Sequence, residues 1–149
     1  LLVGRFRKHV LALDMTFLVS VQSWRVVGLA LFFLWSYGLL RGGFAVPAAI
    51  GDIIVGVGAV FVGLRVARGQ SGWQRQVIAL SVLGLGDFVF AVWAANFAGP
   101  LPFDPPPADT SIAAGILTRL PLAVIPAFLV PAFSLAHFAA LAQLLRRPG

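Results

Sequence analysis

Four apolar stretches, each long enough to cross a lipid bilayer as an α-helix, dominate this sequence. A membrane-spanning helix needs about 20 mostly apolar residues. The stretches run from about residues 17–40, 45–66, 76–97 and 120–145. Hydrophobic residues make up 60% of the 149 positions and charged residues 11%, an excess that a soluble domain of this size cannot bury. We therefore predict an all-α, polytopic transmembrane helix bundle of about four spans, forming a single domain over residues 1–149.

The composition also excludes several kinds of chemistry. Cysteine is absent, which excludes disulfides, iron–sulfur ligation and thiolate zinc sites. Glutamate is absent as well. The chain has no phosphate-binding glycine loop with a lysine, no Gly-x-Ser-x-Gly elbow and no histidine pair at i, i+4. We predict no catalytic residue, metal site or cofactor. The net charge of +6 is typical of basic loops beside anionic lipid, and we expect no nucleic-acid partner.

Basic residues gather on one side of the four-span arrangement. They precede the first span, flank the loop between the second and third spans, and follow the last span: Arg5, Arg7, Lys8, Arg65, Arg68, Arg75, Arg146 and Arg147. The positive-inside rule then predicts that both termini lie in the cytoplasm. We expect the membrane to be a bacterial inner membrane. Residues 1–16 form a cytoplasmic or interfacial lead-in. Residues 99–111 form an external loop whose prolines favour an extended connection.

Two aspartates lie within the apolar stretches, each on a stripe of small residues. At 100° per residue, Asp52 shares one face of its helix with Ala48, Gly56, Ala59 and Gly63. Asp87 shares an arc with four other small residues: Gly84, Ala91, Ala95 and Ala98. Small residues permit close approach of a second helix, so both carboxyl groups are expected to face the bundle.

Helix depth indicates partners for Asp87. At a rise of 1.5 Å per residue, Asp87, Arg25 and His137 are expected to converge in the inner half of the bilayer. An unpaired charge there costs about 3 kcal/mol on insertion scales. A static ion pair and a proton relay both explain Asp87, and His137 is either a packing residue or a ligand. If the first span begins near Trp24, Arg25 is instead an interfacial anchor.

The same depth arithmetic separates Asp52 from that group. Asp52 is expected nearer the outer end of its span, at the depth of Asn96 and Ser36. Gln22 shares the Arg25 face of the first span. The predicted intramembrane polar network therefore consists of Asp87, Asp52, Arg25, His137, Asn96 and Gln22.

Prolines interrupt the last apolar stretch. Pro126 and Pro131 each remove an internal hydrogen bond and are expected to kink the fourth helix. Broken helices at membrane depth often accompany transport sites, because freed carbonyl groups face a cavity. A fixed bend that only shapes the packing explains the same residues.

Three patterns resemble a bacterial family of uncharacterised multipass membrane proteins. They are Gln22-x-x-Arg25-x-x-Gly28, then Phe44-Ala45-x-Pro47-Ala48-x-x-Gly51-Asp52, and finally Leu120-Pro121 to Pro131 followed by His137. The resemblance covers most of the chain and implies no activity. It implies additional N-terminal helices, which agrees with a chain that begins at Leu1 instead of Met.

Two functions from different classes fit these features. The favoured hypothesis is a non-catalytic subunit or scaffold of a membrane assembly, in which the polar network fixes helix packing. The alternative is a small proton- or ion-coupled carrier with Asp87 as the titrating group. A membrane redox protein with His137 as a ligand is a third hypothesis. Four spans are few for a self-contained carrier, so we expect a homo-oligomer or other membrane subunits as partners.

Overall fold

Four helices of the structure are long and apolar enough to cross a membrane. The computed structural model describes residues 12–107 and 115–146, and within these ranges every regular element is a helix. The elements are α2 (Met15–Ser20), the 3-10 helix η1 (Val21–Leu29), α3 (Ala30–Ser36), α4 (Gly42–Ala67), α5 (Trp73–Phe97), the short 3-10 turn η2 (Ile116–Thr118), the π-helical turn η3 (Ile125–Leu129) and α7 (Val130–Leu144). The predicted all-α bundle of four spans is confirmed.

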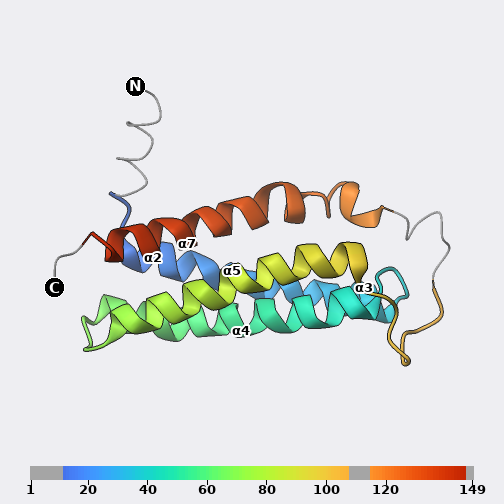
Figure 1. Ribbon diagram of the computed structural model, residues 1–149, viewed down its shortest axis with the longest axis horizontal. Helices are drawn as coiled ribbons and strands as arrows, with labels where there is room; N and C mark the ends of the chain where they lie inside the picture. The colour runs from blue at the N-terminus through green and yellow to red at the C-terminus, as the bar shows by residue number, and fades with distance from the viewer. Residues whose placement is uncertain (1–11, 108–114, 147–149) are drawn as a thin grey trace, which may run out of the picture.

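The four spans lie side by side along one axis (Figure 1). The first consists of α2, η1 and α3 in continuous succession, the next two are α4 and α5, and the fourth is η3 followed by α7. We call the end with the α4–α5 turn and the start of α2 the terminal end. The opposite end, where α4 begins and residues 98–107 and 115–124 lie, is the proline end.

Two groups of buried apolar residues form the core. Nearer the terminal end, all four spans contribute: Met15, Leu18, Val19, Val55, Ala59, Val77, Leu80, Ala136, Ala139 and Ala140. Nearer the proline end, the buried group comes from α3 and α4 alone: Leu31, Ala45, Ala48 and Ala49. Large apolar side chains such as Val89, which is 72% exposed, cover the outside of the bundle. This arrangement suits lipid as the surrounding solvent, and the chain is a multipass membrane protein.

The first span begins earlier and ends earlier than predicted. Helix starts at Met15 and ends at Ser36, against the predicted range of 17–40. Asp14 sets the start, because its side chain accepts a 3.0 Å hydrogen bond from the N–H of Phe17 and caps the helix. The alternative start near Trp24 is therefore wrong. The last two residues of the expected lead-in 1–16 are helical, and its residues 1–11 lie outside the described part of the chain.

The fourth span begins later than predicted. Residues 120–123 form turns, and the span starts at Ile125 instead of Leu120. Pro126 lies in the π-helical turn η3, and Pro131 is the second residue of α7. Since neither proline has an N–H to donate, regular α-helical bonding starts only after this segment. Residues 99–107 of the expected external loop are described, and 108–111 lie outside the described ranges.

Candidate functional site

The guanidinium of Arg25 ties the first span to two others. Its Nε donates to Oδ1 of Asp52 on α4 at 2.7 Å, and its Nη2 donates to Oδ2 of Asp87 on α5. Its Nη1 donates to the carbonyl oxygen of Gly84 at 3.2 Å. The Arg25 side chain has no exposed area, while the side chains of Asp52 and Asp87 are 19% and 12% exposed. We call Arg25, Asp52 and Asp87 the arginine cluster.

The two carboxyl groups of the arginine cluster lie at the same depth on α4 and α5. Asp52 is the eleventh residue of α4 from Gly42, and Asp87 is the eleventh residue of α5 counted back from Phe97. Because α4 and α5 run in opposite directions, both carboxyl groups lie at one level. Arg25 is the eleventh of the 22 residues of the first span, so its side chain reaches that level from the middle of that span.

Three glycines make room for the polar side chains. A Cβ at Gly28 would lie 2.3 Å from Oδ2 of Asp52, and one at Gly51 would lie 1.8 Å from Oδ1 of Asp87. A Cβ at Gly84 would lie 2.2 Å from Nε2 of His137 and 2.8 Å from Nη1 of Arg25. Any larger residue at these positions must displace a charged or polar group. Two features of the sequence indicate this close packing: Gly28 follows Arg25 by three residues, and Gly51 directly precedes Asp52.

His137 and Gln22 extend the polar region on the terminal side of the cluster. Nδ1 of His137 lies 3.2 Å from Oγ of Ser81, and Nε2 of Gln22 donates to the carbonyl oxygen of Phe133 at 3.0 Å. Both side chains are buried, and among the described residues neither Nε2 of His137 nor Oε1 of Gln22 has a hydrogen-bond partner. Nε2 of His137 and Nη1 of Arg25 both lie against the same side of Gly84, so the two side chains are close neighbours.

Asn96 lies outside this region, and the expected depth of Asp52 is corrected. Asn96 is exposed, and its Nδ2 donates to the carbonyl oxygen of Val92 in its own helix at 2.7 Å. The exposed hydroxyl of Ser36 donates to Phe33 in the same way at 2.8 Å. Asp52 binds Arg25 instead of residues at this level. Helix α4 begins at Gly42, three residues before the predicted start, which places Asp52 about 4.5 Å deeper at 1.5 Å per residue.

An aromatic ring and a small cavity lie next to the arginine cluster. The guanidinium carbon of Arg25 lies 4.0 Å from the centre of the Phe88 ring, a cation–π contact that sequence reasoning missed. A cavity of about 30 Å³ adjoins Arg25 and Asp52 and is also lined by Leu129 and Phe133. That volume holds about one water molecule. Within the described ranges, no three His, Cys, Asp or Glu side chains are grouped to hold a metal ion.

The comparisons with known proteins place the chain in a family. Residues 1–145 match a domain of unknown function, DUF8737. The chain belongs to the DUF8737 family. No curated protein matches it, and no solved structure matches it either. The arginine cluster and the four apolar spans are thus features of a membrane protein of this family.

A second polar site of the DUF8737 chain, also missed from sequence, holds the proline end together. Oδ2 of Asp104 accepts from the N–H of Gly42 at 3.0 Å, and Oδ1 accepts from Nε1 of Trp35 at 2.8 Å. Asp104 thereby supplies the acidic cap that α4 lacks locally. Burial raises the pKa of the Asp104 carboxyl, but hydrogen bonds with Gly42, Trp35 and Leu101 outweigh it and hold this pKa below its ordinary value.

Proposed function

We propose that this protein is a non-catalytic subunit or scaffold of a membrane assembly, and that the arginine cluster fixes the register of its helices. The observation that carries this proposal is the binding of one buried guanidinium to Asp52 and Asp87 on two other spans. Sliding either α4 or α5 by one turn would move a carboxyl group about 5 Å away from Arg25. An unpaired charge at this depth is costly, so the cluster favours one alignment.

The size of the adjacent cavity supports a structural role. The cavity beside Arg25 and Asp52 measures about 30 Å³, far below the several hundred Å³ of a typical small-molecule site. The donors of Arg25 are already directed at the two carboxyl groups and the Gly84 carbonyl. In this packing the cluster joins helices and leaves no space for a substrate of ordinary size beside it.

A disulfide cross-link tests the proposed role in register. The chain has no native cysteine, and a Cβ at Gly63 would lie 3.8 Å from Cβ of Ser20, a separation that suits a disulfide. Ser20→Cys with Gly63→Cys is expected to cross-link α2 to α4 in membranes. Addition of Asp87→Asn should preserve the cross-link, since the amide oxygen still accepts from Arg25. Addition of Arg25→Leu should reduce it several-fold; an unchanged yield would contradict the proposal.

A proton-coupled carrier is the second candidate, and one observation favours it. The cluster holds two carboxyl groups for one guanidinium, and both carboxyl side chains retain some exposed area. One proton taken up by the pair balances the charges of the cluster. Reconstituted vesicles containing a pH-sensitive dye separate the candidates. A scaffold is expected to leave proton leakage at the level of protein-free vesicles. Proton flux that Asp87→Asn abolishes, and Asp104→Asn leaves unchanged, would establish the carrier instead.

The redox hypothesis receives less support from the packing of His137. A ligand atom must be free of hydrogen bonds, and Nε2 of His137 has no such partner in the described part of the chain, but it faces the backbone of α5 at Gly84. The other ring nitrogen is taken up by Ser81. A group bound to Nε2 would have to displace Gly84 and the adjacent Arg25 side chain. We therefore retain the scaffold as the proposed function.

A further inference from the structure

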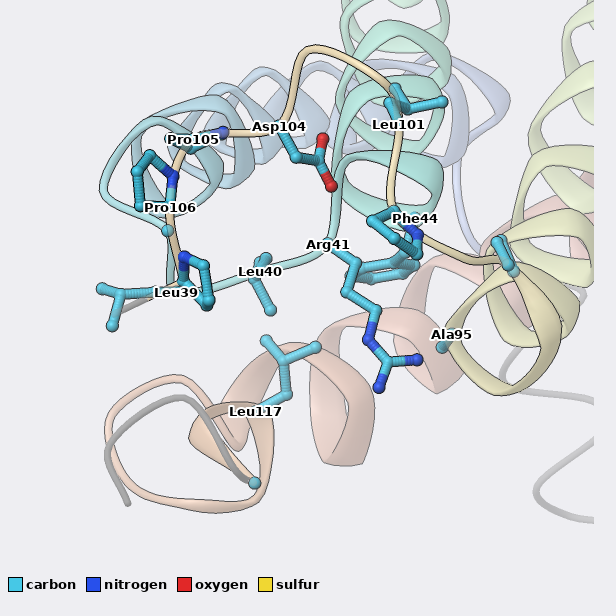
Figure 2. Close-up of a pocket in the computed structure, with 16 residues that line it drawn as sticks. Leu39, Leu40, Arg41, Phe44, Ala95, Leu101, Asp104, Pro105, Pro106 and Leu117 are labelled. Atoms are coloured by element: carbon cyan, nitrogen blue, oxygen red, sulfur yellow. The ribbon is translucent and has the colours of Figure 1, made fainter. Parts of the chain in front are cut away.

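A large cavity lies at the proline end, away from the arginine cluster. It is a groove of about 930 Å³ between the turn before α4, the end of α5 and the segment that follows α5 (Figure 2). Its walls are mostly apolar and include Leu40, Phe44, Ala95, Leu101 and Leu117. Pro105, Pro106 and Pro107 form one rim, and proline gives such a rim little backbone freedom. The volume lies within the range of sites that hold small molecules.

Arg41 gives this groove a positive charge. Its side chain extends into the groove between Ala95 and Leu117 (Figure 2). Among the described residues, no hydrogen bond or ion pair engages the guanidinium of Arg41. Asp104, the acid that also lines the groove, is already bonded to Gly42 and Trp35. Within the part of the chain that the structure describes, the groove therefore combines an apolar wall with one cation that has no ion-pair partner.

The position of the groove relative to the membrane identifies its ligand. Arg41 immediately precedes α4, and Ala95 lies in the last turn of α5, so the groove lies where the apolar spans end. At that level a bilayer changes from acyl chains to headgroups. Guanidinium groups bind phosphate through paired hydrogen bonds, and the apolar wall suits an acyl chain. We propose that this groove binds one anionic phospholipid, with its phosphate on Arg41 and an acyl chain against α5.

Native mass spectrometry of the full chain in detergent tests this site, with phosphatidylglycerol and phosphatidylcholine as probes. The wild type is expected to retain one phosphatidylglycerol in preference to phosphatidylcholine. Arg41→Gln should weaken phosphatidylglycerol retention by on the order of tenfold, because a charge-assisted hydrogen bond is lost. Arg119→Gln is the matched control, since Arg119 is an exposed arginine of the same end that does not line the groove. It should retain lipid like the wild type.

A second variant tests the apolar part of the site. Ala95→Trp would fill the groove from an exposed position on α5 and should reduce retention of both lipids, with the helix content unchanged by circular dichroism. Equal lipid retention in Arg41→Gln and the wild type would overturn the proposal. So would full competition by inorganic phosphate, which would indicate a free-anion site, or a dimer that forms in place of the lipid complex. Retention unaffected by Ala95→Trp would exclude the groove as the acyl site.

Discussion

Gly51 packs so closely against Asp87 that a Cβ at position 51 would lie 1.8 Å from a carboxylate oxygen of Asp87. The two residues belong to α4 and α5, and their contact lets the arginine cluster close between those helices. Gly51, which directly precedes Asp52, thus makes room for Asp87. This relationship, together with the contacts of Arg25, His137 and Asp104, leads to four predictions.

Gly51→Ala should destabilise the bundle. The added methyl group must displace Asp87 from Arg25, and overpacking of this kind costs about 1–3 kcal/mol. Unfolding by SDS in mixed micelles measures the effect. Gly86→Ala is the matched control, because no atom lies within 4 Å of a Cβ at that exposed position of α5. The control should be as stable as the wild type or more so, since alanine favours helix. Equal stability of the two variants would refute the contact.

Removal of Arg25 alone should cost more than removal of the whole cluster. Arg25→Met leaves Asp52 and Asp87 without their partner, which typically costs about 3–5 kcal/mol for a buried ion pair. The triple variant Arg25→Met, Asp52→Leu and Asp87→Leu carries no charge at this depth and should recover most of that loss. The same SDS titration compares them. A triple variant less stable than Arg25→Met would show that the charges are not coupled.

Ser81→Ala should destabilise the packing of α5 against α7. The substitution removes the group that lies 3.2 Å from Nδ1 of His137. The Nε2 atom of the same ring already lacks a hydrogen-bond partner in the described ranges. Leaving a buried polar atom unsatisfied costs about 1–3 kcal/mol. His137→Phe in the Ser81→Ala background should restore part of the loss, because no polar ring atom then remains. A double variant no more stable than Ser81→Ala would contradict the role of this contact.

The proline end should loosen at low pH through Asp104. Its hydrogen bonds with Gly42 and Trp35 favour the ionised carboxyl, so the folded-state pKa lies below the ordinary value. The stabilisation is complete above the ordinary carboxyl pKa and is lost as pH falls through the lowered pKa. The protection factor of the Gly42 amide, which is its exchange rate relative to the intrinsic rate at the same pH, measures this change by NMR in micelles from neutral pH downward. Asp104→Asn should abolish that pH dependence; its persistence would assign the effect to another group.

The number and type of spans followed from the sequence, because their physical cause is local. Apolar runs of about 20 residues have no soluble alternative, and in lipid their backbone must form helix. The burial of Ala48, Gly56 and Ala59 beside Asp52 also followed from helical periodicity. Span ends were less accurate: Asp14 starts the first helix through a capping bond, and the two prolines delay the fourth.

Which polar groups meet was decided only by tertiary structure. Asn96 lies nine residues after Asp87, which at 100° per residue is the opposite face of α5, and it is exposed and bonds its own helix. Asp52 and Asp87 reach Arg25 because Gly28, Gly51 and Gly84 permit close packing of the spans. Asp104 accepts a hydrogen bond from Gly42, a residue 62 positions earlier in the chain. A sequence pattern gives the face and approximate depth of a residue on its own helix. The distance between two helices depends on how both surfaces fit, which no single segment contains.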